Sequence, residues 1–272
     1  MSVQSYLDSV AKNAILKDST ITTSISTLKN RLGYYFDSSD VINHFTFGSN
    51  TRYTMLPRRY DPKSDVDYMV VFNNTGHQPQ TYLNRLKYFV ERYYSSSERK
   101  QSHPTIRLNL NHITFELVPA VYNVFYGYQI PAPANNFETW ISTDPNDFNS
   151  KLTDKNRNNY SLIKPLIRIL KYWNANADYV FESYDLEQKI VGMNFLFCYN
   201  IKDYFYSAVE QLHCSYWSPQ WKQNAVNKLK NTVSSAKEGA NKQVISSQAD
   251  SLIKISRIWA DFFPANTSNQ PI

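Results

Sequence analysis

The spacing of apolar residues predicts two amphipathic helices in the N-terminal half of the chain. Residues 20–36 carry an apolar side chain at every third or fourth position, and Asp18, Ser19 or Thr20 can cap the helix start. A second helix is predicted over residues 82–93. Its apolar face consists of Tyr82, Leu83, Leu86, Phe89, Val90 and Tyr93. Each helix therefore has one face to bury against another element.

Shorter apolar runs predict strands around these helices. Residues 66–72 form a compact run of β-type residues, which indicates a buried strand. Residues 105–118 predict two strands joined by a short polar turn, which is typical of an antiparallel hairpin. Residues 50–63 are polar, contain two prolines and predict a loop.

The C-terminal half is predicted to be helical. Residues 162–173 share an apolar helix face, although Pro165 should start or kink that helix. Further helical patterns fall near residues 185–206, 219–236 and 243–263. Residues 127–150 are rich in Pro, Asn and Asp and indicate a connector between lobes.

These elements predict an α+β fold with two lobes. Residues 1–140 should form an α+β lobe that includes the N-terminal helix, and residues 141–272 should form a helical lobe. We expect the functional site in the cleft between the two lobes.

Composition narrows the class of protein. The 272 residues are 42% hydrophobic, as in globular proteins, and no apolar run reaches membrane-spanning length. Cys198 and Cys214 are the two cysteines and form no C-x-x-C pair, so we expect no disulfide framework and no zinc site. Free thiols and the lack of a secretory signal indicate a cytoplasmic protein that does not bind membranes. The net charge of +6 favours polyanions such as nucleic acid or nucleoside triphosphates.

The chemistry is concentrated between Phe47 and Phe72. Gly48 and Ser49 form a turn whose amide and hydroxyl groups can bind phosphate oxygens, although Gly-Ser is also an ordinary turn. Asp65 and Asp67 are two residues apart on a predicted strand, so they share one face and can hold Mg²⁺ together. The alternative for these aspartates is a capped turn that enters the strand.

Glu116 is a third acid, inside the predicted strand segment HITFELVPA. A carboxylate among apolar neighbours needs a partner, because burying it alone is costly. A metal ion is one candidate partner, and Arg107 is the other. Three carboxylates on neighbouring strands would suit nucleotidyl transfer with two metal ions.

Three residues of the helical half are further candidates. Lys171 ends an apolar helix face and is either a solvated cation or a phosphate ligand. Ser183 precedes a helix and is either its N-cap or, with Tyr184, part of a nucleotide site. Spacing alone favours the cap.

The order of these motifs resembles the polymerase-β-like nucleotidyltransferase superfamily. Within it, the segments GSNTRYT, SDVDYMVVF, FELVPAV, LIRILKYWN and IWADFFP are similar to those of the bacterial cGAS/DncV-like nucleotidyltransferases. These are the CD-NTases of the SMODS type, which make cyclic oligonucleotides in anti-phage (CBASS) signalling. The resemblance runs over residues 45–264.

The resemblance implies roles for the candidate residues. Ser49, after Gly48, would contact the donor triphosphate, and Asp65, Asp67 and Glu116 would hold two Mg²⁺ ions, with Mn²⁺ as a possible substitute. The third acid is more usually aspartate in this family.

The helical half would complete the nucleotide site. The resemblance implies that Lys171 reaches the triphosphate, that Ser183 contacts phosphate and that Tyr184 stacks on a base. A zinc-binding insert like that of the animal DNA sensor is missing from the sequence, so nucleic acid should not be required.

The resulting hypothesis is a synthetase that makes a cyclic di- or oligonucleotide from nucleoside triphosphates, with a downstream effector that binds the product. Two alternatives stay open. One is a nucleotidyltransferase that acts on an RNA end, a protein or a small molecule. The other is a catalytically silent protein that binds nucleotides or RNA.

Overall fold

The computed structural model contains two compact units. It describes residues 2–16, 18–95, 97–102, 104–132 and 139–242. One unit is Leu16–Lys151, and the other combines Met1–Ile15 with Leu152–Ile272. This division differs from the expected one in two respects. The N-terminal helix groups with the C-terminal helices, and the boundary lies at residue 151 instead of residue 140.

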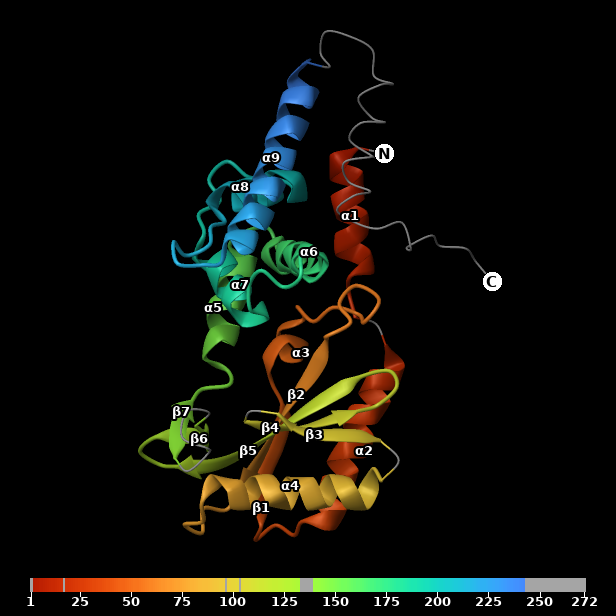
Figure 1. Cartoon of the computed structure of the whole chain (residues 1–272), viewed down its shortest axis with the longest axis vertical. Helices are drawn as coiled ribbons and strands as arrows, with labels where there is room; N and C mark the ends of the chain where they lie inside the picture. Colours follow the sequence, from red (N-terminus) through yellow and green to blue (C-terminus); the bar gives the residue numbers. More distant parts are fainter. Residues whose placement is uncertain (1, 17, 96, 103, 133–138, 243–272) are drawn as a thin grey trace, which may run out of the picture. The chain divides into compact units, whose positions relative to one another are not determined.

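A mixed sheet forms the centre of the unit Leu16–Lys151 (Figure 1). Its described strands are β1 (Val41–Thr46), β2 (Asp65–Phe72), β3 (Glu98–Ser102), β4 (Thr105–Asn109), β5 (Thr114–Asn123), β6 (Gly127–Pro131) and β7 (Trp140–Thr143). The main order is β1-β2-β5-β4-β3, while β6 pairs with β5 and β7 with β6. Only β2 and β5 are parallel among the described pairs.

The predicted hairpin and buried strand are confirmed as β4–β5 and β2. The expectation that residues 127–150 connect two lobes is wrong, because that stretch groups with the sheet unit. That stretch contains β6 and β7, and it also contains the start of α5 (Asp147–Arg157). Tyr128 of β6 pairs with Thr143 of β7. These strands form because neighbouring strands are available for pairing, and the Pro and Asn content of the segment does not indicate that.

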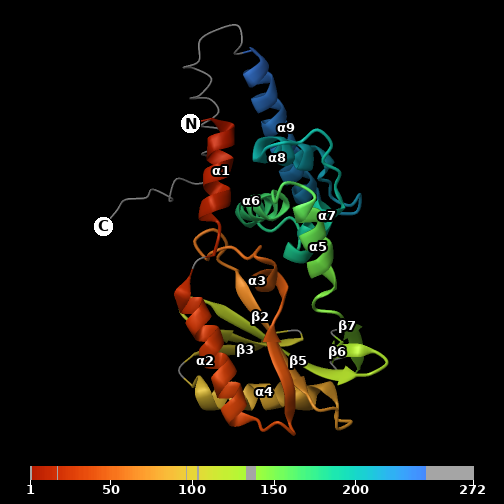
Figure 2. The same ribbon diagram turned by 180° about the vertical axis from the view of Figure 1, so that it is seen from behind.

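Two helices cover one face of this sheet, α2 (Ser19–Tyr35) and α4 (Pro79–Tyr93) (Figures 1 and 2). Both confirm predicted helices, and the Asp18 side chain caps α2 by accepting a hydrogen bond from Thr20 N. From β2, every second residue packs into the core under these helices: Val66, Tyr68, Val70 and Phe72. Because side chains alternate along a strand, Asp65 and Asp67 face the opposite side of the sheet.

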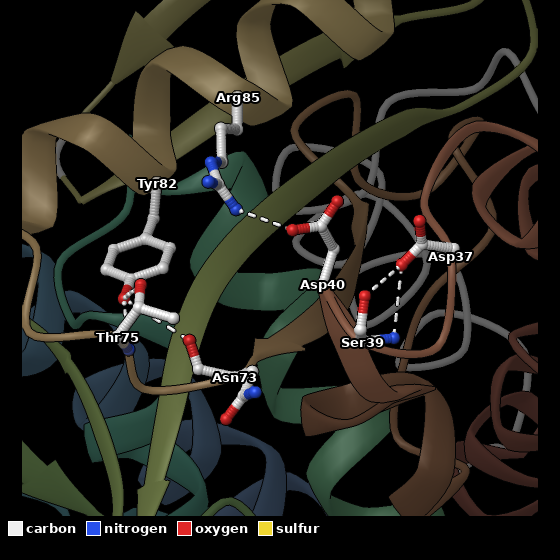
Figure 3. A network of polar contacts seen from close by, with 7 residues as sticks. All are labelled: Asp37, Ser39, Asp40, Asn73, Thr75, Tyr82 and Arg85. Atoms are coloured by element: carbon white, nitrogen blue, oxygen red, sulfur yellow. Dashed lines mark hydrogen bonds and ion pairs between the residues drawn. The ribbon is translucent and has the colours of Figure 1, made fainter.

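A polar network ties the ends of β1 and β2 to α4 (Figure 3). Asp40 pairs with Arg85 at 3.1 Å, and its carbonyl accepts a 2.9 Å hydrogen bond from Asn73 N. The hydroxyl of Tyr82 donates to the Asn73 carbonyl. This network holds the end of β2 that is remote from Asp65.

The other unit is helical. Its described helices are α1 (Val3–Asn13), most of α5, α6 (Ile163–Asn176), α7 (Ser183–Gly192), α8 (Ile201–Gln211) and α9 (Gln220–Lys242). Helix α1 packs on α6 and α8 through its buried residues Leu7, Val10 and Ala11. That apolar face explains why the N-terminal helix belongs to this unit.

One predicted helix of this region is divided in two, and another lies outside the described residues. The helix predicted over residues 185–206 is divided into α7 and α8, and Phe197 between them has a φ of 58°. The helix predicted over residues 243–263 lies outside the described residues. Among the helices that the structure describes, none is both long enough and apolar enough to cross a membrane.

A buried ion pair joins α6 to α7. Lys171 Nζ lies 3.1 Å from Glu187 Oε1, and the two side chains are only 5% and 1% exposed. An ammonium group that loses its carboxylate partner in such a place stays buried and uncompensated. The packing of α7 on α6 therefore requires both the positive charge of Lys171 and the negative charge of Glu187.

We expect Glu187→Gln to lower the free energy of unfolding by about 3 kcal/mol, because it leaves the buried Lys171 without a counter-charge. Urea denaturation followed by circular dichroism measures this change. Asp154→Asn is the matched control, since it removes the Arg157 pair in the same unit from a side chain that is 60% exposed. The control should cost less than about 1 kcal/mol, and equal effects of both variants would contradict this account.

Candidate active site

Gly48 lies directly against the carboxylate of Asp67. It begins the short helix α3 (Gly48–Arg52) with a φ of 69°, a conformation that favours glycine. A Cβ at this position would overlap the Asp67 carboxylate and lie 2.9 Å from its Cγ. Phe47 N donates a 3.1 Å hydrogen bond to the Asp67 carbonyl, which fixes this approach. The predicted Gly-Ser turn is thus a helix start built onto β2.

The parallel pairing of β2 and β5 brings the three predicted acids to one face. Asp67 is the register partner of Glu116, and Asp65 is the partner of Thr114. Paired residues of adjacent strands point to the same side of a sheet, at a strand spacing of about 4.8 Å. The acids therefore lie in adjacent rows on the face opposite α2 and α4.

Glu116 has a cationic neighbour on its other side. Arg107 is its register partner on β4, and Arg107 Nε lies 3.2 Å from Glu116 Oε1. The two groups are within ion-pair distance, but the Nε–H is not aligned for a hydrogen bond. The Glu116 side chain is 24% exposed. Of the two partners expected for Glu116, Arg107 is the one that the structure shows.

Carboxylate oxygens on one face suit a hard divalent cation such as Mg²⁺. In the described part of the chain, no group of three or more His, Cys, Asp or Glu is gathered closely enough to hold a metal. The side chains therefore share a face without converging on one point. The donor types suit Mg²⁺, and in such a site Glu116 would have to leave Arg107.

The opposite face behind Asp67 carries a neutral polar pair. Tyr68 Oη and His44 Nδ1 are 2.9 Å apart. Burial raises the pKa of Tyr68 to about 12, and burial, with a contribution from Lys29, lowers the pKa of His44. At pH 7 both groups are neutral, so this pair adds no charge near the acids.

The predicted residues of the helical unit have different surroundings. Lys171 is buried and paired with Glu187, so the expectation of a solvated cation is wrong. Ser183 is the first residue of α7 and is exposed, and the N-cap is Glu182, so Ser183 is not the cap that spacing favoured. Tyr184 is 45% exposed. Ser183 and Tyr184 are accessible in the described helical unit.

Sequence reasoning missed a polar chain beside the acids. Arg58 Nη2 donates a hydrogen bond to Thr114 Oγ1, which in turn donates to Asn109 Oδ1 at 2.8 Å. Arg58 belongs to a predicted loop, where no motif marks it. The one signal was the Arg58-Arg59 pair itself, which is equally typical of a solvated loop.

The sequence is similar to one family model and to one curated protein. The family model described as "Second Messenger Oligonucleotide or Dinucleotide Synthetase domain" matches residues 1–156. A protein of Bacillus cereus strain VD146 named "Probable cyclic nucleotide synthase" is 32% identical over 99 residues. That match covers 34% of this chain and 29% of the Bacillus protein.

Solved structures of low sequence identity share the fold. CdnC of E. coli MS115-1, in complex with HORMA-deltaN, has a TM-score of 0.67 at 12% identity, covering 96% of this chain and 97% of CdnC. CdnG of Bradyrhizobium diazoefficiens, a CD-NTase in complex with GTP, has a TM-score of 0.67 at 11% identity. The match covers 94% of this chain and 97% of CdnG. DncV of Vibrio cholerae has a TM-score of 0.65 at 12% identity, and the match covers 84% of this chain and 69% of DncV.

The family match spans more than half of the 272 residues and includes β2, β5 and the three acids. The fold is that of the CD-NTases, with an α+β sheet unit and helices. The chain belongs to the Second Messenger Oligonucleotide or Dinucleotide Synthetase family of nucleotidyltransferases.

Proposed function

We propose that this protein is a metal-dependent synthetase that joins nucleoside triphosphates into a cyclic di- or oligonucleotide and releases pyrophosphate. The observation that carries the proposal is the row of acids beside Gly48, on a chain of this family. Two related folds support triphosphate substrates, because CdnG was solved with GTP and DncV with the linear intermediate pppA(3′,5′)pG.

In the proposed reaction, a ribose hydroxyl oxygen forms a bond to the α-phosphorus of a triphosphate, and the bond from this phosphorus to the β-phosphate oxygen breaks. Glu116 is the candidate base for the hydroxyl proton. Asp65, Asp67 and Glu116 would hold two Mg²⁺ ions, which would supply charge neutralisation at the phosphates when bound. A second transfer within the linear product closes the ring.

The remaining predicted residues bind and orient substrate in this proposal. Ser49 contacts the donor triphosphate, and the exposed Ser183 and Tyr184 contact phosphate and a base. Lys171 is proposed as a phosphate contact that must first leave Glu187, because both side chains are buried as a pair. The product would act on a downstream effector in anti-phage signalling.

Product analysis tests the reaction. The purified protein is incubated with the four labelled ribonucleoside triphosphates and Mg²⁺, without RNA or protein acceptor, and the products are identified by mass spectrometry. We expect a phosphatase-resistant cyclic nucleotide and pyrophosphate, both abolished by EDTA. Product formed only when RNA, a protein or a small molecule is added would instead support a different acceptor. Triphosphate binding without any product would support the silent alternative.

Asp67→Asn should reduce turnover by about a thousandfold, since a lost metal ligand raises the barrier by about 4 kcal/mol. The rate of pyrophosphate release measures this. Asp40→Asn is the control, because Asp40 is an acid at the opposite end of the same strand pair (Figure 3). Asp40→Asn should keep the parent rate, and an Asp67→Asn protein with the parent rate would show that the site is assigned incorrectly.

Gly48→Ala tests the close approach to Asp67. It should destabilise the fold by about 1–2 kcal/mol through the positive φ and also displace the Asp67 carboxylate, which lowers turnover. Gly76→Ala is matched for backbone strain, with a φ of 75°, but its Cβ would meet no atom within 4 Å. Thermal melts should show similar destabilisation of the two variants. Turnover should be lost in Gly48→Ala alone. Full activity in a folded Gly48→Ala protein would refute this contact.

A further inference from the structure

A polar cavity lies where β4 ends and β5 begins. Its volume is about 740 Å³, within the range of about 300–1,000 Å³ that is usual for pockets that bind small molecules. Arg58, Asn109, Asn111, His112 and Thr114 contribute to its lining. The cavity is formed entirely by the unit Leu16–Lys151.

Arg58 provides the first sign of a ligand. Arg58 is a cationic residue of the lining, and its Nη2 is held by a hydrogen bond to Thr114 Oγ1. Guanidinium groups match phosphate and carboxylate oxygens best. Arg58 therefore points to an anionic ligand.

The other lining groups add recognition beyond charge. Asn109, Asn111 and His112 carry amide and imidazole groups, which can pair with the edges of a base or with ribose hydroxyls. The His112 ring is held in place by Ser24 of α2, with Nε2 and Oγ 2.8 Å apart. An inorganic phosphate would leave most of the cavity and these groups unused, whereas a nucleotide would use them.

The cavity also adjoins the proposed active site. Thr114, which accepts the hydrogen bond from Arg58, is the register partner of Asp65 on β2. A ligand that draws Arg58 into the cavity would change the contact next to the first metal-binding aspartate.

We propose that this cavity is a further nucleotide-binding site, in which Arg58 binds a phosphate group without a metal ion and the asparagines contact the base or ribose. The ligand is either a nucleoside phosphate or the cyclic product, since both present the same phosphate and base chemistry. This site goes beyond the proposed function. Binding of a nucleoside phosphate does not depend on that function, whereas binding of the cyclic product rests on it.

Isothermal titration calorimetry of the whole protein in EDTA tests the site. The probes are AMP, GMP, a cyclic dinucleotide and inorganic phosphate. AMP and GMP represent nucleoside phosphates, and the cyclic dinucleotide represents the product. We expect saturable binding of at least one nucleotide probe, retained in Asp67→Asn. Arg58→Gln should weaken it at least about tenfold, as the loss of a charged hydrogen bond predicts. The neighbouring Arg59 is exposed and lies over Tyr60, so Arg59→Gln is the matched control and should change the Kd less than about twofold.

Asn111→Ala keeps the test decisive if Arg58→Gln does not fold, because Asn111 is exposed and its loss should not affect the core. It should weaken nucleotide binding at least about threefold. Absence of saturable binding, equal losses in Arg58→Gln and Arg59→Gln, or phosphate binding as tight as nucleotide binding would each overturn the proposal. None of these results touches synthesis, which the Mg²⁺-dependent product assay measures separately.

Discussion

The site depends on the parallel register between β2 and β5. That register sets Asp67 beside Glu116, and two carboxylates at strand spacing repel one another unless a cation lies nearby. In this structure the cation is Arg107 on β4, on the far side of Glu116. Asp67, Glu116 and Arg107 therefore form a row across three strands, with two negative charges against one positive charge, and this excess of negative charge favours a further cation.

The rest of the sheet unit supports this row. Helices α2 and α4 pack on the opposite face of the strands, so the acids do not point into the main core. Gly48 allows α3 to start against the Asp67 carboxylate, and the hydrogen bond from Phe47 N to the Asp67 carbonyl ties the Gly48-Ser49 turn to β2. Thr114 and Arg58 extend the same surface to a polar cavity. The proposed further nucleotide site therefore lies next to the proposed active site.

Local pattern was enough to predict much of this fold. The apolar spacing predicted α2 and α4, the compact run at residues 66–72 predicted β2, and the i, i+2 spacing placed Asp65 and Asp67 on one face. The local sequence pattern could not predict which segments far apart in the chain pair with one another. The parallel register of Asp67 with Glu116, the burial of Lys171 against Glu187, and the packing of α1 on α6 all depend on contacts between distant segments.

The proposed metal site requires that Glu116 leave Arg107 and join the two aspartates around an ion. A crystal structure with Mn²⁺ and a non-hydrolysable triphosphate, with Mn²⁺ located by anomalous scattering, tests it directly. The account predicts anomalous peaks within bonding distance of Asp65, Asp67 and Glu116, and Arg107 released from Glu116. An ion bound elsewhere, with the Glu116–Arg107 pair intact, would contradict it.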